Sequence, residues 1–232
     1  MDTINKKTSE NGTNEGLNKM NTLEEFYAGS GILVTGATGF VGKGLLEKLM
    51  RVCPRIGAIF ILIRPRTNET IEQRFKELID DPIYDGIKAK HPSVLSKVHP
   101  VKGDVGLPDL SLSREDRNLL LEKVNIVFHV AATVRFDEPL HVAVNVNTKG
   151  TARILELWNE LKHPISFVHV STAYSNANLH EIGKKFIRKY KLYANAVPCI
   201  TNIIFMIIPR RISLLIMILQ HEFETFRSDR YL

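Results

Sequence analysis

The chain has 232 residues, of which 44% are hydrophobic and 24% charged, so it is long enough to bury one full core. Its formal net charge of +6 lies entirely in the last fifth: residues 1–182 carry 22 basic and 22 acidic side chains, residues 183–232 carry 9 and 3. A body without net charge argues against a nucleic-acid-binding protein. With only Cys53 and Cys199 and no secretory signal, we expect an intracellular protein without a disulfide framework.

Residues 1–22 are rich in Asn, Thr, Lys and Glu and hold almost no large apolar side chain, which predicts a disordered leader. From Phe26 to Ile182, apolar strand-like stretches alternate with helical ones, which is the pattern of βαβ units around a parallel sheet. The expected strands are residues 31–35, 58–63, 97–101, 125–130 and 165–170. The expected helices are residues 40–52, 69–79, a stretch capped by Ser113, and 147–161.

Residues 183–232 abandon this alternation and are basic, then apolar, then polar. The apolar part, residues 200–219, invites a membrane-spanning interpretation. Each Ile, Leu or Phe contributes roughly −0.5 kcal/mol to insertion, whereas Arg210 and Arg211 near the centre oppose it by about 3 kcal/mol each. We therefore favour a surface-lying or poorly folded segment over a true span.

Three glycines spaced by three, Gly36, Gly39 and Gly42, separate the first strand from the first long helix. Such spacing predicts a tight turn, a close backbone approach to a pyrophosphate, and close packing of the helix, whose N-terminus attracts the anion. The alternative is a tight strand-to-helix turn without a ligand. The loop residues predicted to bind a dinucleotide are Thr35, Gly36, Thr38, Gly39, Phe40 and Gly42.

The ends of the second and third strands carry further candidates. Arg64 and Arg66 stand where an acid would select NAD, and a guanidinium there can pair with the 2′-phosphate of NADPH. Solvated loop arginines are the alternative, and it weighs more for Arg66. Asp104 can accept a hydrogen bond from the adenine amino group while Val105 covers the ring, although Asp104 could equally be a turn former.

The fourth strand ends in "HVAA", where Ala131 and Ala132 are small enough to let a cofactor lie across the carboxyl edge of the sheet. His129 precedes them on the same strand. A single histidine without a spaced partner is more often a hydrogen-bonded core residue than a metal ligand, and we expect no metal site.

The stretches "TGATGFVG", "LIRPR", "GDV", "HVAATVRFDEPL", "NVNTKGT" and "VHVSTAYSN", in this order, closely resemble the cofactor domain of fatty acyl-CoA reductases, alcohol-forming members of the extended short-chain dehydrogenase/reductase group. The resemblance implies a Rossmann-type, doubly wound parallel sheet, incomplete at its C-terminus. It implies NADPH as cofactor and a long-chain fatty acyl-CoA as substrate, reduced through the aldehyde to a fatty alcohol. It also implies a membrane-surface association, peroxisomal or endoplasmic reticulum in the full-length family.

Hydride transfer to a carbonyl carbon leaves charge on its oxygen, so a hydroxyl must hydrogen-bond that oxygen and an acid must protonate it. The resemblance assigns the hydroxyl to Thr172, with Ser171 as the less favoured neighbour. From the residues alone, either hydroxyl could instead be structural and bond the backbone. It also assigns to Asn147 the role of a helix asparagine that steadies these groups, although such an Asn can simply bond the backbone.

The acid in this family is a Tyr followed four residues later by Lys, on a helix well after "STAYSN". No tyrosine in that region has a Lys at the required offset. Tyr84 and Lys88 have the spacing but lie between the second and third strands, and we interpret them as a coincidence.

The predicted organisation is a leader at 1–22, an NADP-binding Rossmann domain at 26–182, and a tail at 183–232 unlike the family. "GKK" at 183–185 is what translation through a splice-donor boundary would give, so we expect a truncated or read-through product. The function implied is reduction of fatty acyl-CoA. The alternative is a catalytically inactive NADPH-binding fragment that lacks the Tyr/Lys pair, and an epimerase or dehydratase on the same fold is disfavoured by "RFDEPL" and "STAYSN".

Overall fold

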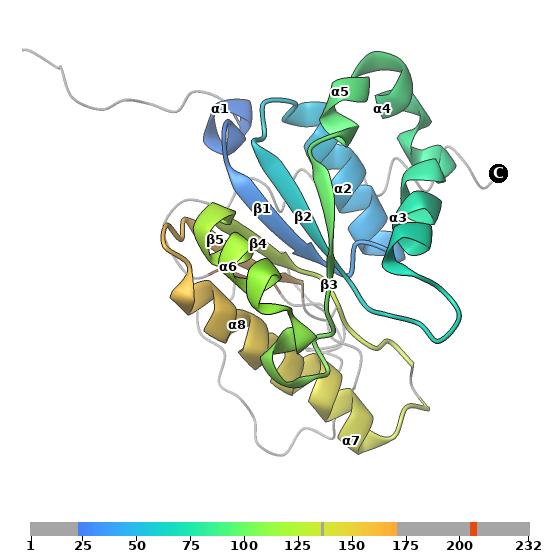
Figure 1. The fold of residues 1–232 in the computed structure, drawn as a ribbon, viewed down its shortest axis with the longest axis vertical. Coiled ribbons are helices and arrows are strands. Elements are labelled where there is room, and N and C mark those ends of the chain that lie inside the picture. Colours follow the sequence, from blue (N-terminus) through green and yellow to red (C-terminus); the bar gives the residue numbers. More distant parts are fainter. Residues whose placement is uncertain (1–22, 136, 171–204, 208–232) are drawn as a thin grey trace, which may run out of the picture.

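A central sheet separates two layers of helices in the computed structural model, which describes residues 23–135, 137–170 and 205–207 (Figure 1). The sheet has the strand order β3-β2-β1-β4-β5-β6. In that order the strands are β3 Val98–Lys102, β2 Ala58–Ile63, β1 Gly31–Thr35, β4 Ile126–His129, β5 Ser166–Val170 and β6 Phe205–Ile207. The first five pair in parallel, which confirms the α/β class and the five strands expected from the alternating pattern.

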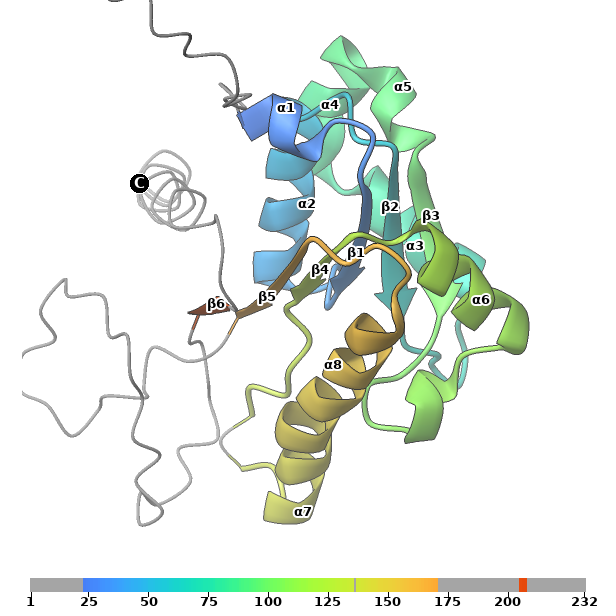
Figure 2. The ribbon, with the colours of Figure 1, turned by 90° about the vertical axis from the view of Figure 1, so that its left-hand side faces the viewer.

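The sixth strand is a difference from the expected sheet. β6 comes from the apolar stretch at 200–219 and pairs antiparallel with β5, with Val168 opposite Ile207 and Val170 opposite Phe205 (Figure 2). A three-residue strand inside a continuous apolar run has no alternation of its own, so the sequence pattern carried no signal for it. Within the described ranges, no helix is both long enough and apolar enough to cross a membrane.

The helices fall into two sets, one on each face of the sheet (Figure 1). One face is covered by α1 Leu23–Tyr27, α2 Phe40–Val52, α3 Ile71–Asp80, α4 Asp85–Lys90 and α5 Pro92–Leu95, with a short 3-10 turn at Pro82–Tyr84. The other face is covered by α6 Arg114–Lys123 and α8 Gly150–Glu160, the latter preceded by α7 Leu140–Ala143 and a π-helical segment, Val144–Lys149. The four expected helices correspond to α2, α3, α6 and α8, and the short segments were not predicted.

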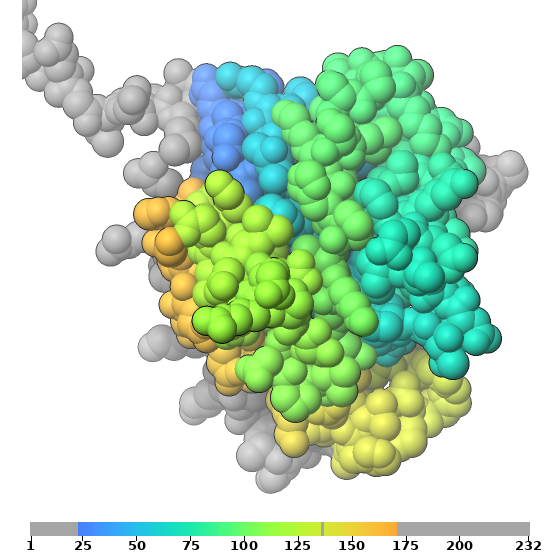
Figure 3. Space-filling view, in the orientation of Figure 1, coloured from blue at the N-terminus to red at the C-terminus, as the bar shows by residue number. Residues whose placement is uncertain are grey.

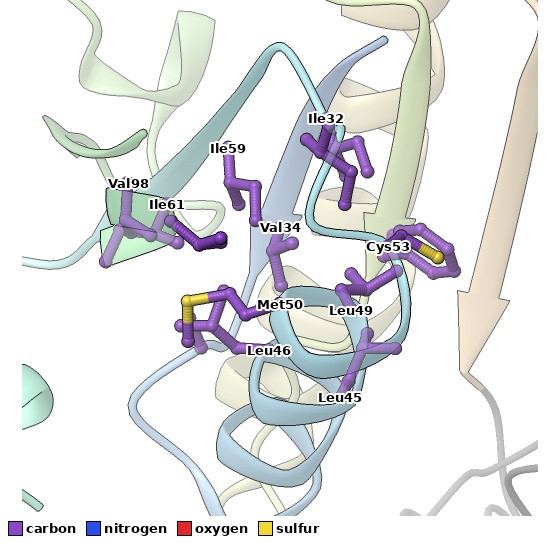
Figure 4. Close-up of a cluster of buried hydrophobic side chains, with 14 of the residues drawn as sticks. Ile32, Val34, Leu45, Leu46, Leu49, Met50, Cys53, Ile59, Ile61 and Val98 are labelled. Carbon is purple, nitrogen blue, oxygen red and sulfur yellow. The ribbon is translucent and has the colours of Figure 1, made fainter. Parts of the chain in front are cut away.

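Two apolar cores, one on each side of the sheet, hold the layers together. Successive side chains of a strand point to opposite faces, so Ile32 and Val34 of β1 pack under α2 while Leu33 packs toward α6 and α8. Figure 4 shows the first core, where Leu46 and Met50 of α2 lie against the strand side chains. All five residues of β1 are buried, as expected for a strand covered on both faces.

A buried polar network joins the carboxyl ends of β1 and β4 to α8. Nδ1 of His129 lies 2.7 Å from Oγ1 of Thr35, and its Nε2 lies 3.1 Å from Oγ1 of Thr151. The Thr35 oxygen already accepts the backbone amides of Val130 and Ala131, each at 3.1 Å. Because both of these amides donate, the hydroxyl proton of Thr35 must point at Nδ1.

The direction of these hydrogen bonds fixes the protonation of His129. With Nδ1 accepting, the ring proton sits on Nε2 and is donated to Thr151, whose hydroxyl donates in turn to the Asn147 carbonyl at 2.7 Å. His129 is fully buried, which confirms that it is a hydrogen-bonded core residue. Burial, reinforced by the neighbouring His169, lowers the pKa of His129 from 6.5 to about 3.

We expect this histidine to make the stability of the fold depend on pH. Between pH 6.5 and about 3, the unfolded imidazole is protonated while the folded one stays neutral, so the unfolded state binds more protons. The free energy of unfolding should therefore be level above pH 7 and fall below pH 6.5, by up to about 1.4 kcal/mol per pH unit from this group.

Urea unfolding of the chain and of His129→Gln at several pH values measures this contribution. The stability advantage of the original chain over His129→Gln should shrink steadily from pH 7 to pH 4. His163→Gln, which replaces an exposed histidine, should run parallel to the original chain. An advantage that stays constant over this range contradicts the neutral, buried assignment.

Candidate functional site

A cleft of about 790 Å³ opens at the carboxyl ends of β1 to β4, between the loops that follow them. All residues predicted to bind the cofactor line it: Thr35, Gly36, Thr38, Gly39, Phe40, Gly42, Arg64, Asp104, Val105, Ala131 and Ala132. The segment between β4 and α8, yellow in Figure 3, lies beside the segments that follow β2 and β3. The sheet changes winding direction between β1 and β4, the place where open α/β sheets bind ligands.

The glycine loop between β1 and α2 forms the floor of the cleft. Gly36 has a φ of +72°, and a Cβ on it would lie 2.7 Å from the Ala131 amide nitrogen. A Cβ on Gly42 would collide with the Gly36 carbonyl. These two glycines are therefore explained by the turn and by the packing of the first helical turn on the loop.

Gly39 differs from its two neighbours in the motif. It is exposed, its φ of −85° suits any residue, and a Cβ there would meet only the Gly36 carbonyl oxygen, at 3.3 Å. Among the described residues this one contact is the only steric constraint on a side chain at this position. Gly39 is also the N-cap of the thirteen-residue helix α2 and offers no side chain to cap it, so the helix start is open to an anion.

Arginines gather where β2 ends. Arg64 and Arg66 follow the strand, and Arg74 reaches the same wall of the cleft from α3. Arg74 is 8% exposed and donates to the Arg64 carbonyl, which fixes the backbone carrying that arginine. Glu69 lies 3.1 Å from Arg66 and 3.5 Å from Arg74.

The balance of charge in this cluster favours an added anion. One carboxylate, that of Glu69, serves two guanidinium groups, and among the described residues no carboxylate pairs with Arg64. Burial, followed by the charges of Arg66 and Arg64, lowers the pKa of Arg74. Burial is the larger cause and the two neighbouring guanidinium groups are the smaller one, and a phosphate placed beside the three arginines would offset their mutual repulsion.

The loop after β3 closes the opposite wall. Asp104 Oδ1 accepts the Gly106 amide at 2.8 Å, so Asp104 does form the turn that was one of its two sequence interpretations. The same side chain lines the cleft, together with Val105. Because a carboxylate has two oxygens, the turn uses one and leaves Oδ2 available for a ligand.

Asn147 does not line the cleft but holds a residue that does. Its Oδ1 accepts the Thr133 amide at 2.8 Å, and its Nδ2 donates to the Thr133 carbonyl at 3.0 Å. The side chain therefore bonds backbone, as the alternative interpretation had it, but the backbone belongs to the loop after β4. The Thr133 hydroxyl donates to Glu138 at 2.8 Å, and both residues line the cleft.

Two predicted catalytic residues, Ser171 and Thr172, lie outside the described residues. The described part of β5 ends at Val170, which lines the cleft and so brings the chain to its edge. Tyr84 is fully buried, its hydroxyl donates to the Lys43 carbonyl at 3.3 Å, and it does not line the cleft. Burial raises the pKa of Tyr84 far above its usual value, the opposite of what an acid catalyst needs.

Sequence reasoning missed three groups that shape the cleft: Arg74, Thr133 and Glu138. Arg74 sits at a helical position where an arginine is normally solvated, so only its burial reveals it. Thr133 lies within "AATVRF", and its contact with Asn147 spans fourteen residues with no local pattern to mark it. Phe40, which was predicted, and Val134, which was not, both line the cleft and are 71% and 67% exposed.

Comparison with known proteins agrees with this geometry. A family of NAD-binding domains described as male sterility proteins matches residues 34–218. This match extends beyond residue 182, so the boundary placed there stays a prediction. Human fatty acyl-CoA reductase 2 is 42% identical over 163 residues, and mouse fatty acyl-CoA reductase 1 is 39% identical over the same length. Each match covers 70% of this chain and 32% of the relative.

Solved structures show the same fold. The terminal reductase domain of the myxalamid biosynthetic pathway matches 63% of this chain and 35% of its own, with 30% identity and a TM-score of 0.53. A nonribosomal peptide synthetase reductase domain from Mycobacterium tuberculosis matches 64% and 34%, with 28% identity and a TM-score of 0.52. The chain spans about a third of the length of the curated relatives it matches. Because the family match covers most of its residues, the chain belongs to the male sterility family of NAD-binding domains, and it is similar to fatty acyl-CoA reductases over 70% of its length.

Proposed function

We propose that the cleft binds NADPH and that the chain is the cofactor-binding part of a reductase that converts long-chain fatty acyl-CoA, through the aldehyde, to a fatty alcohol. The observation that carries the proposal is the pairing of an unobstructed helix start at Gly39 with an under-neutralised arginine cluster at the end of β2. The first feature suits the diphosphate of any dinucleotide, and the second suits the extra phosphate that distinguishes NADPH from NADH.

Each wall of the cleft takes one part of the cofactor in this proposal. The diphosphate lies at the start of α2, and Arg64 and Arg74 hold the 2′-phosphate. Asp104 accepts from the adenine amino group through Oδ2, and Val105 covers the ring. Ala131 and Ala132, small residues at the end of β4, leave room for the dinucleotide to cross the sheet edge.

NADPH supplies hydride when bound. One hydride and one proton convert the thioester to an aldehyde and free coenzyme A, and a second hydride and proton convert the aldehyde to the alcohol, so two NADPH are consumed. We assign to Thr172, or to its neighbour Ser171, the hydrogen bond to the carbonyl oxygen where charge develops. Asn147 keeps the loop after β4 in place through its two bonds to Thr133.

The second candidate is an NADPH-binding fragment that does not turn over substrate. The burial and the hydrogen bond of Tyr84 favour this candidate, because neither Tyr84 nor Lys88, the Tyr/Lys pair with the family spacing, lines the cleft. Loss of a general acid typically lowers a rate by about 10²- to 10⁴-fold. Mixing the purified chain with NADPH and palmitoyl-CoA distinguishes the two: the first candidate forms hexadecanol and oxidises NADPH, whereas the second binds NADPH and leaves palmitoyl-CoA intact.

Gly39→Val tests the diphosphate site. A bulky side chain at this exposed position should block the approach of the diphosphate and weaken NADPH and NADH alike, by at least about tenfold. The melting temperature is measured alongside, because the added Cβ meets the Gly36 carbonyl oxygen at 3.3 Å and valine is a weaker N-cap than glycine, so some loss of stability is expected besides the loss of affinity. Calorimetric titration gives both affinities. Gly86→Val is the matched control, since a Cβ at Gly86 meets nothing within 4 Å. Unchanged affinity in Gly39→Val would refute the diphosphate site.

Arg64→Gln tests the choice between the two nicotinamide dinucleotides. Removing the guanidinium should weaken NADPH by about tenfold or more and leave NADH unchanged, because charge-assisted bonds to a phosphate contribute about 1.5–3 kcal/mol. Arg66→Gln is the control. Because Arg66 is already paired with Glu69 at 3.1 Å, this substitution should change the ratio of the NADPH and NADH affinities less than Arg64→Gln does. Equal losses for both dinucleotides in Arg64→Gln would speak against a 2′-phosphate site.

A further inference from the structure

The loop that carries Asp104 accepts a hydrogen bond from one guanidinium, which belongs to the neighbouring helix α8. Arg153, on α8, donates through Nη1 to the Val105 carbonyl at 2.8 Å and to the Asn145 carbonyl at 3.2 Å. Its Nη2 donates to Asn145 Oδ1 at 3.0 Å. All three acceptors are neutral, so this arginine is committed to fixing backbone and one side-chain amide.

Asn145 connects Arg153 to the turn at Gly106. A guanidinium only donates, so the Asn145 oxygen must face Arg153 and its Nδ2 must face the other way. That Nδ2 donates to the Gly106 carbonyl at 2.7 Å, and the Gly106 amide donates to Asp104 Oδ1 at 2.8 Å. An unbroken series of hydrogen bonds therefore runs from Arg153 through Asn145 and Gly106 to the carboxylate in the cleft.

The surrounding packing leaves this loop little freedom to adjust. A Cβ on Gly106 would lie 3.2 Å from Asp104 Oδ1 and 3.5 Å from Asn145 Nδ2. A Cβ on Gly150, the first residue of α8, would lie 3.2 Å from the Val105 side chain. The turn therefore lies directly between the start of α8 and the cleft. We expect a substitution of Arg153 to shift the position of the Asp104 carboxylate.

We propose that Arg153 is a positioning residue for adenine recognition: by holding Asn145, Val105 and Gly106, it sets the direction in which Asp104 presents its second oxygen. The inference rests on the proposed function, because it takes the ligand of this wall to be the adenine of NADPH. A guanidinium holds three acceptors in one fixed plane because its donors form a rigid fork, whereas the three donors of an ammonium rotate on a flexible stem. The consequence is selectivity for a 6-amino purine, since only a donor at that position satisfies the carboxylate.

The experiment compares NADPH with its hypoxanthine analogue, in which the 6-amino group is replaced by an oxygen. Calorimetric dissociation constants are measured for both dinucleotides with the full chain. We expect the original chain to prefer NADPH by about tenfold, the value of one well-made hydrogen bond. Asp104→Asn should reverse the preference, because its amide would retain the turn and donate to the hypoxanthine oxygen.

Arg153→Met is the decisive variant. It should reduce the preference for NADPH to about twofold or less, mainly by weakening NADPH, while the hypoxanthine analogue loses little. Asn145→Ala is a smaller change that breaks the same series of hydrogen bonds. It should reduce the preference for NADPH in the same way, and it replaces Arg153→Met in the test if that variant does not fold. Arg117→Met removes a guanidinium that bonds Glu160 at 2.8 Å on the surface between α6 and α8, and should preserve the preference.

The outcomes separate this inference from the function on which it rests. If Arg153→Met and Asn145→Ala bind both dinucleotides more weakly by the same factor, the preference for NADPH is unchanged. That result overturns the positioning role and leaves the proposed NADPH binding intact. Equal binding of both dinucleotides by the original chain overturns the adenine contact and the positioning role together, while the diphosphate site survives. A folded chain that binds neither dinucleotide overturns the proposed function as well.

Discussion

The cleft depends on the junction between the end of β1 and the end of β4. Gly36 turns the chain with a positive φ so close to Ala131 that no side chain fits between them. The Thr35 hydroxyl, one residue earlier, accepts two amides from the other strand end and gives its own proton to His129. Steric fit and a directed set of hydrogen bonds thus fix the same two backbones. This junction lies at the switch in strand order, where the cleft opens.

The π-helical segment before α8 fixes two further loops that line the cleft. Asn145 and Asn147 lie two residues apart in that segment and so project in different directions. Asn145 holds the loop after β3, and Asn147 holds the loop after β4. One irregular turn of helix thereby connects the loop proposed to bind adenine with the loop after β4. Irregular helix turns of this kind are often found at functional sites.

Much of the fold, and the grouping of the candidate site residues around one cleft, could be predicted from local patterns. The strand-to-helix alternation predicted five strands. The candidate residues that follow the first four of them in the chain line one cleft, because parallel strands share a carboxyl edge. The roles of Arg74 and Arg153 were not predicted. Each donates from a helix to the backbone of a distant loop, and such a contact depends on how the helix is oriented in the fold. Asp104 shows how two interpretations can coexist, because a carboxylate can form a turn with one oxygen and offer the other. The antiparallel β6 and the π segment were missed because neither has a sequence period of its own.

The most direct measurement of the central claim is a titration of the isotope-labelled chain with NADPH, followed by the backbone amide resonances in nuclear magnetic resonance spectra. Our account predicts that the largest changes fall on the amides of Gly39 to Gly42, with a second group at Arg64 and Asp104, and that NADH reproduces the first group but not the change at Arg64. Changes confined to other surfaces, with the amides at the start of α2 unmoved, would contradict it.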